Sequence, residues 1–474
     1  MIELPRYLAR NFRAVLRKSV LLHEPRTAVA GITLATGADG FTIRARQADI
    51  AVEHRLGGNF AADQLVVPSN AFADFEGTDA LPVRLERSPK GVTARWQERG
   101  LPRCQEYEWA AKDKPPDWPP TPQQWATLPP EFLQALDDAM QTASRESVRY
   151  ATHRVQFRGG TGQLIATDGK QLLIQSEFNF PFQEDLLVSR IMAFGCHAVP
   201  PDKPVQIGRT NKFLTVQSGF WTFHLAIDAQ ARFPRAEEVI PKTKPVTVFQ
   251  VAPAERDFLL QVLPKLPGEK DDNAPVTLAL NGHAVVRAKA DGQSRTTEVV
   301  LEKSHVSGKA LRFATCRAYV SRALQLGFGE LAVVSPDTPI LCRDQSRLYL
   351  WMPLGEKSAL KPAANALRIT PPVNGEHPSA VPTSPRKRAM STNGRNDHPT
   401  AVRPPPPVPP ATNGSPPSPL SLVEEAEALQ NLLREALART TRLVAGLKQQ
   451  KKQQRLVSST LASLRQLQQV QGQP

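Results

Sequence analysis

The sequence predicts an α+β protein of three similar tandem domains, followed by a tail of different composition. Long predicted helices begin near residues 6, 130 and 254, so a unit of helix plus strands recurs at an interval of about 124 residues. That interval is too long for a solenoid repeat and matches the size of a small domain. Within each repeat the helix-plus-strands unit occurs twice. The expected domains are residues 1–122, 123–244 and 245–355.

The clearest local pattern lies in the central domain, from Arg149 to Phe178. Side chains alternate between two faces from Tyr150 to Phe157, which indicates a strand. A second expected strand, Gln163–Thr167, precedes Asp168-Gly169, a pair that tolerates the positive φ angles of a tight hairpin. A third strand follows over residues 172–174. We therefore expect an antiparallel meander in which Asp168 is a turn residue and not a catalytic carboxylate.

The other expected elements follow the same repeat. The expected helices are 6–17, a short one ending at 75, 130–143, 186–194, 254–263 and 316–326. The expected strands are 28–34, 41–45, 50–54, 64–67, 83–86, 92–97, 107–110, 205–207, 213–217, 221–227, 276–280, 284–288, 296–301, 331–335, 340–343 and 348–352. A proline-rich linker at 112–122 ends the first domain.

Charge patterning separates the first two long helices. The first helix is amphipathic, with arginines at helical spacing opposite an apolar side. These arginines are Arg6, Arg10, Arg13 and Arg17. Two interpretations stay open, an ordinary solvated face or a surface that contacts phosphates. The second long helix is acidic instead, through Glu131, Asp137 and Asp138.

The composition excludes several classes of function. The net charge of +14 is typical of a protein with a polyanionic partner, usually a nucleic acid. The four cysteines are scattered singly, which predicts reduced thiols in a cytosolic protein. Apolar runs are too short for a membrane-spanning helix, and the N-terminus lacks the apolar core of a signal peptide. Because no catalytic, phosphate-binding or metal-ligating pattern is found, we expect neither enzymatic activity nor a cofactor.

The tail differs from the preceding 355 residues and carries 16 Lys+Arg against 7 Asp+Glu. Residues 356–419 are rich in proline and predict a disordered, partly polyproline linker. Residues 420–471 predict an amphipathic helix, which a capping box of Ser421 and Glu424 begins. Its heptad seam indicates either coiled-coil pairing or docking onto the rest of the chain.

Three motifs resemble the bacterial sliding clamp, the beta subunit of DNA polymerase III. They are IATDGKQLL at 165–173, RFPRAEEVIP at 232–241 and LYLWMPL at 348–354. The resemblance covers roughly residues 1–355. It implies three clamp domains in a crescent, two of which join head to tail around duplex DNA. It also implies that Arg26 lies with the helix arginines on the DNA side, and that Tyr107, Trp109 and Leu266 lie at the dimer interface.

The resemblance further implies a groove between the second and third domains that binds short peptides of polymerases, the clamp loader and repair proteins. The implied groove residues are Thr152, Thr167, Gly169, Lys170, Gln171, Leu172, Pro234, Val239, Tyr319, Pro339, Leu350, Met352, Pro353 and Leu354. Mostly apolar, the set suits short peptide motifs. Departures from the family pattern are Lys170, Gln171, Cys316 and Gly355, which predict an altered peptide preference.

The sequence therefore indicates one of two functions. The first is a DNA sliding clamp, a non-catalytic subunit that tethers a replicative polymerase to DNA and makes synthesis processive. It would be a cytoplasmic, nucleoid-associated homodimer with no membrane partner. The alternative is a clamp-fold paralogue that serves as a protein-interaction scaffold without a role in replication.

Overall fold

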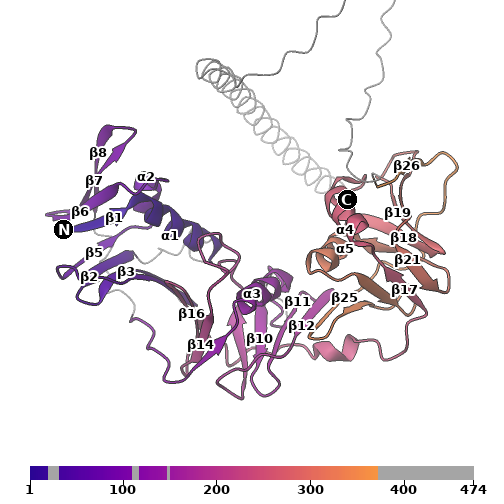
Figure 1. Ribbon diagram of the computed structural model, residues 1–474, viewed down its shortest axis with the longest axis horizontal. Coiled ribbons are helices and arrows are strands. Elements are labelled where there is room, and N and C mark those ends of the chain that lie inside the picture. Colours follow the sequence, from indigo (N-terminus) through magenta and orange to yellow (C-terminus); the bar gives the residue numbers. More distant parts are fainter. Residues whose placement is uncertain (20–30, 48, 109–116, 147–149, 372–474) are drawn as a thin grey trace, which may run out of the picture. The chain divides into compact units, whose positions relative to one another are not determined.

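The described part of the chain forms four β-sheets with helices against them (Figure 1). The computed structural model describes residues 1–19, 31–47, 49–108, 117–146 and 150–371. Arg26 and Trp109 lie outside these residues, as does the tail from 372 onward with its expected helix at 420–471. The α+β fold class predicted from the sequence is confirmed.

The first two sheets use strands from the N-terminal half. The four-stranded sheet has the order β1 (Ile2–Pro5), β6 (Pro82–Ser88), β7 (Gly91–Glu98), β8 (Leu101–Glu108). The eight-stranded sheet has the order β5 (Asp63–Val67), β2 (Ile32–Gly37), β3 (Gly40–Gln47), β4 (Ile50–Leu56), β16 (Trp221–Ala226), β15 (Phe213–Ser218), β14 (Val205–Arg209), β9 (Trp125–Leu128). The eight-stranded sheet thus joins strands of the first and second predicted domains.

The other two sheets extend to the C-terminal part. The nine-stranded sheet has the order β13 (Asp185–Ser189), β10 (Arg154–Arg158), β11 (Gln163–Thr167), β12 (Gln171–Gln175), β25 (Arg347–Trp351), β24 (Ile340–Arg343), β23 (Glu330–Val333), β17 (Thr247–Gln250), β21 (His305–Gly308). The five-stranded sheet has the order β22 (Leu311–Cys316), β18 (Pro275–Asn281), β19 (His283–Ala288), β20 (Thr297–Leu301), β26 (Leu367–Ile369).

Two strand pairs hold distant parts of the chain together. At the first seam β4 pairs with β16 in antiparallel register, with His54 opposite Trp221. At the second seam β12 pairs with β25, with Leu172 opposite Leu350. Because backbone hydrogen bonds cross both seams, each of the two large sheets is continuous across a boundary between predicted domains.

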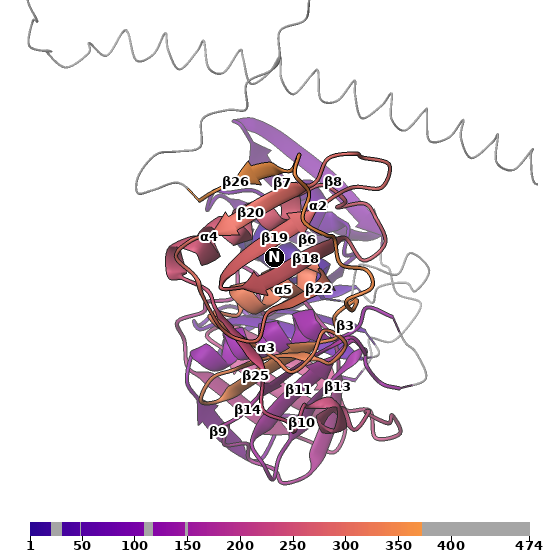
Figure 2. The ribbon, with the colours of Figure 1, turned by 90° about the vertical axis from the view of Figure 1, so that its right-hand side faces the viewer.

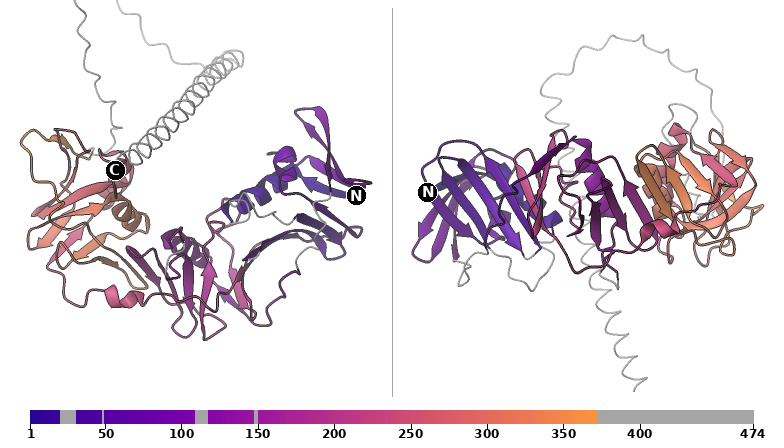
Figure 3. Two further views of the ribbon diagram at one scale, coloured as in Figure 1. Left: turned by 180° about the vertical axis from the view of Figure 1, so that it is seen from behind. Right: turned by 90° about the horizontal axis from the view of Figure 1, so that it is seen from below.

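Five α-helices within the described residues pack their apolar sides on the sheets (Figures 1 and 3). They are α1 (Arg6–Lys18), α2 (Ala71–Phe75), α3 (Glu131–Thr142), α4 (Pro253–Val262) and α5 (Arg317–Gln325). Phe12 of α1 and Phe132 of α3 lie in one core, and Leu259 of α4 lies in a second core. The helices predicted near residues 6, 130, 254 and 316 and the short helix ending at Phe75 are therefore confirmed.

One predicted helix is wrong. Residues predicted as helix 186–194 begin with strand β13, which pairs with β10 in antiparallel register and buries Leu186 and Val188. The edge of β10 requires a partner, and strand pairing outweighs a weak helical pattern in so short a segment. The predicted strand from Tyr150 also starts later, at Arg154, because the preceding residues form a turn. The backbone N–H of Ala151 donates to the carbonyl of Arg232.

Several short strands were not predicted: β1, β9, β17, β21, β22 and β26. The last of these corrects the predicted linker, which was expected to be disordered from residue 356. Leu367–Ile369 pairs in parallel with β20, and the N–H of Leu367 donates to the carbonyl of Thr296 at 2.8 Å. The ordered chain therefore continues past Gly355.

Candidate functional site

An apolar cluster lies at the second seam on the sheet face away from α3. Residues of β12 alternate between the two faces, so Leu172 and Ile174 share this cluster with Leu348 and Leu350 of β25. Leu173 points the other way and belongs to the core beneath the helices. The cluster therefore combines residues that are far apart in the sequence.

The segment 232–241 packs over part of this cluster. Ala236 is buried in it, and Phe233 and Ile240 pack against it. Val239, at the end of the 3-10 helix η2 (Ala236–Val239), is 51% exposed. Met352, which follows β25, is 44% exposed. We call Leu172, Leu350, Val239 and Met352 the seam patch, in which the two leucines are buried and Val239 and Met352 are exposed.

The Asp168-Gly169 hairpin positions one end of the seam patch. One carboxylate oxygen of Asp168 accepts the backbone N–H groups of Lys170 at 2.8 Å and Gln171 at 2.9 Å. Gly169 has a φ of +89°, which a side chain would oppose. Asp168 is thus a turn residue, as predicted. The N–H of Met352 donates to the carbonyl of Lys170 at 2.9 Å, which fixes Met352 beside the exposed Lys170.

The Gln171 side chain lies on the sheet face opposite to Leu172, contrary to the implied groove. The Gln171 side chain lies on the helix side, where its amide donates to the Thr142 carbonyl and accepts from the Tyr349 hydroxyl at 2.7 Å. The Tyr319 hydroxyl donates to Asp168 at 3.4 Å. Burial, and then the nearby Asp168 charge, raise the pKa of Tyr319, so its hydroxyl stays a hydrogen-bond donor. Strand alternation explains this correction, because Gln171 adjoins Leu172 and must point to the opposite face.

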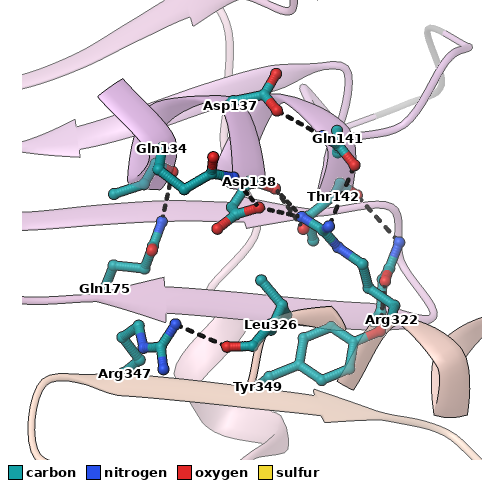
Figure 4. A network of polar contacts seen from close by, with 12 residues as sticks. Gln134, Asp137, Asp138, Gln141, Thr142, Gln175, Arg322, Leu326, Arg347 and Tyr349 are labelled. Carbon is teal, nitrogen blue, oxygen red and sulfur yellow. Dashed lines mark hydrogen bonds and ion pairs between the residues drawn. The ribbon is translucent and has the colours of Figure 1, made fainter. Parts of the chain in front are cut away.

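An ion pair with little solvent exposure joins α3 to α5 beside these residues (Figure 4). The Arg322 guanidinium donates to the Asp138 carboxylate and to the Asp138 carbonyl, both at 3.0 Å. It also donates to Gln141 at 3.1 Å. Since Asp137 and Asp138 are both buried, the acidic surface predicted for the second long helix is reduced to Glu131. Burial raises the pKa of Asp137, whose carboxylate accepts a hydrogen bond from Gln141.

The other implied groove residues, together with those of the hairpin and β25, fall into three groups. Thr167, Gly169, Lys170, Leu172, Leu350 and Met352 come together at the hairpin and at β25. Pro353 and Leu354 continue from β25, and the Leu354 N–H donates to the carbonyl of Ala314. Pro234 precedes η2, Pro339 precedes β24, and Thr152 is buried ahead of β10.

Several residues of the seam were not predicted from the sequence. Ile174 and Leu348 have the same parity as Leu172 and Leu350, so strand alternation alone would have found them. Arg322 has no comparable signal, because its partner Asp138 lies 184 residues away. Gln175, whose amide donates to the Ala135 carbonyl of α3 at 2.6 Å, is a further contact of this kind.

The arginines of α1 divide into two pairs. Arg6 is buried and ion-paired with Asp79 at 2.9 Å, and it donates to the carbonyls of Phe75 and Glu76. Arg13 is ion-paired with Glu76 at 2.6 Å. Arg6 is therefore a structural residue, which corrects its predicted role in DNA binding, and Arg13 is partly neutralised.

Arg10 and Arg17 are both exposed. Arg17 lines an open hollow of about 760 Å³ between α1 and the start of α2. The other residues around this hollow are Arg13, Ala14, Lys18, Ser69, Asn70 and Ala73. The basic surface of α1 therefore consists of Arg10, Arg17 and Lys18, with two hydrogen-bonding side chains beside it.

Two of the residues implied for the dimer interface, Tyr107 and Leu266, are buried within their own cores. The Tyr107 hydroxyl donates to Asp74 at 3.0 Å, and its ring contacts Phe75. Leu266 lies in the core beneath α4 and α5. In a single copy both side chains are therefore core residues, and their place at the dimer interface stays a prediction. By contrast, residues Leu101 to Glu106 of β8 are all exposed, and β8 is the last strand of its sheet.

No family model matches this chain, and no curated protein matches it in sequence. Solved structures do match it. The DNA polymerase sliding clamp from Pseudomonas aeruginosa matches with a TM-score of 0.61 at 17% identity, over 75% of this chain and 99% of that chain. The DNA polymerase III beta subunit from Thermotoga maritima matches with a TM-score of 0.60 at 15% identity, over 75% of this chain and 99% of that one.

The sliding clamp from Bacillus subtilis matches with a TM-score of 0.60 at 14% identity, over 73% of this chain and 98% of that chain. The chain has the sliding-clamp fold. Nearly the whole length of each matched clamp is covered, so the sliding-clamp fold is present from end to end and not as a fragment. The described residues hold no group of three His, Cys, Asp or Glu side chains placed for a metal ion. They also contain no helix long and apolar enough to span a membrane.

Proposed function

We propose that this protein is a DNA sliding clamp, a non-catalytic ring of two copies that encircles duplex DNA and tethers a replicative polymerase. The observation that carries this proposal is the sliding-clamp fold over nearly the whole length of the matched clamps. A tether needs topology and surface charge but no reactive group. The protein would act in the cytoplasm at the nucleoid.

DNA would be held through the basic surface of α1. Arg10, Arg17 and Lys18 are exposed on this helix, whereas Arg6 is committed to Asp79. Contacts from arginine and lysine to phosphates carry no sequence information, so binding is expected to be independent of sequence. The interaction would release counterions and therefore weaken steeply with salt.

Replacing Arg10 and Arg17 together with serine is expected to reduce the salt dependence of DNA binding. Two residues per copy make four per ring, so the slope of log K against log salt should fall by roughly 2 to 4, at about 0.9 per neutralised phosphate. Fluorescence anisotropy with a labelled duplex at several salt concentrations measures the slope.

The matched control is Arg235→Ser with Lys242→Ser, which removes the same charge from exposed positions of the 232–241 segment and the residue after it. All variants keep the basic tail, so its contribution is common to every measurement. Equal slopes for the α1 variant and this control would show that the α1 arginines are only a solvated face.

Partner proteins would bind at the seam patch. Its exposed side chains are Val239 and Met352, and the Met352 backbone N–H donates to the carbonyl of the exposed Lys170. A short peptide with aliphatic or aromatic side chains fits such a surface, because burial of these groups drives association while Lys170 attracts an acidic residue. The peptides would come from the polymerase catalytic subunit and the clamp loader.

Ring closure would join the four-stranded sheet of each copy to the five-stranded sheet of its partner. The four-stranded and five-stranded sheets each have an outer edge, formed by β8 and by β26 over β20. A contact between β8 of one copy and the other edge of its partner is heterologous and closes a ring of two at the right angle. Backbone pairing between exposed edge strands gives such a contact its affinity.

A further inference from the structure

Strand β26 covers the sheet edge on which ring closure would depend. β26 lies beside β20 at the end of the five-stranded sheet (Figure 2). Among the strand pairs of the described residues, β20–β26 is the only parallel one. β26 lies in the segment that follows β25, which is the last strand of the nine-stranded sheet along the chain. The edge of β20 is therefore occupied by the chain's own residues.

The contacts that hold β26 are few. The strand has three residues, of which Leu367 is 46% exposed. Arg368 is ion-paired with Glu298 at 3.4 Å, and the Arg295 side chain donates to the carbonyl of Asn365 at 2.8 Å. Ile369 packs against the core from its rim. A parallel ladder of this length is also less stable per residue than an antiparallel one.

Strand β20, which pairs with β26, has the buried contacts of an interior strand of a sheet. Glu298 of β20 is buried and ion-paired with Arg287 at 2.6 Å, a contact that does not involve β26. Val299 and Leu301 are buried in the core of the sheet. Loss of β26 would thus leave a formed five-residue edge with free backbone groups, which is a template for another strand.

β8 is the complementary element. It has eight residues against the three of β26, and it can align with all of β20 in the antiparallel sense. An exposed strand of that length with an unpaired edge is a pairing site for another chain. β26 is favoured over β8 as the partner of β20 because it belongs to the same chain. Its effective concentration near β20 is therefore high and does not fall on dilution. Pairing with β8 is favoured by protein concentration and by the longer ladder.

We propose that residues 356–371 act as an intrachain cover, and that β26 must leave β20 before β8 of a second copy can take its place and close the ring. The partner of this edge is a second copy of this chain. This inference rests on the proposed ring and adds a step that regulates its closure. In a single copy β26 covers the edge of β20. That edge becomes free to pair with a second copy only when β26 is displaced.

The test substitutes Leu367 with proline in the full chain. Proline has no N–H to donate to the Thr296 carbonyl, so β26 loses its first ladder bond. Sedimentation equilibrium should show a dimer dissociation constant at least tenfold lower than that of the unsubstituted chain. Lys361→Pro, in the same segment but outside β26, is the matched control and should leave the constant unchanged.

A cross-link identifies the contact that forms. Cys104 is exposed on β8, and Val300→Cys places a thiol on β20. A short bis-maleimide should join these two cysteines between copies, with higher yield when Leu367→Pro is also present. If the cross-link forms equally with and without Leu367→Pro, and the dissociation constant is unchanged, the ring contact is correct and the cover is refuted. If no cross-link forms in either chain, the ring contact itself is wrong.

Discussion

Replacing Arg317 with methionine should lower the free energy of unfolding by about 3–5 kcal/mol, because several buried carbonyls would lose their donor. Arg317 is 4% exposed and begins α5. Its guanidinium donates to five backbone carbonyls, three in the segment that follows α4 and two where β18 begins. These acceptors are Leu263, Leu266, Pro267, Ala274 and Pro275. No side chain of similar size other than arginine presents so many donors at once.

Urea unfolding followed by tryptophan fluorescence and circular dichroism measures this loss. Methionine keeps most of the apolar length of the side chain, so the change reports chiefly on the missing donors. Arg343→Met, at an exposed position of β24, is the matched control and should change the free energy of unfolding by less than about 0.5 kcal/mol. A loss below about 1 kcal/mol for Arg317→Met would mean that water replaces the guanidinium at these carbonyls.

Replacing Val239 and Met352 with aspartate should weaken the binding of partner peptides about a hundredfold, which corresponds to roughly 2.7 kcal/mol. Both side chains are exposed residues of the seam patch, so the substitutions add charge to the proposed binding surface and not to the core. Two carboxylates must be desolvated when an apolar peptide side chain covers them, and this cost opposes binding.

Peptides that tile the catalytic subunit of the replicative polymerase from the same cell supply the probe, and isothermal titration measures affinity for the tightest of them. Phe220→Asp is the control, because Phe220 is 59% exposed and lies beside the first seam instead, where its carbonyl accepts the N–H of Arg55. Unchanged affinity in the double variant, or an equal loss in the Phe220 variant, would place the peptide site elsewhere.

The helices and the Asp168-Gly169 hairpin were predictable because their signals are local. The apolar side of α1, with Leu8, Phe12 and Val15, repeats at helical spacing, and the hairpin pair needs no distant partner. Strands such as β9 and β17 carry only four residues each and exist because a distant strand pairs with them. Single-sequence patterns contain no information on that partner, so these strands were missed.

The site was only partly predictable for the same physical reason. Motif resemblance identified Leu172 and Met352 but could not tell on which face Gln171 lies, and strand alternation answers that question. The arginine pattern of α1 is correct, yet Arg6 and Arg13 meet acidic partners at Asp79 and Glu76, more than sixty residues along the chain. Helical periodicity shows which side of a helix is polar but not which residues of that side are already paired.

Topological retention on DNA tests the central claim most directly. The protein is mixed while dilute with a nicked circular plasmid, concentrated to close the ring, and passed through a gel-filtration column at high salt. A sliding clamp should stay with the circular plasmid, because salt screens the phosphate contacts but cannot release a closed ring. Cutting the plasmid once should release the protein, since it can slide off the ends. Loss of the protein from the circular plasmid at high salt, or equal retention before and after cutting, would contradict the account.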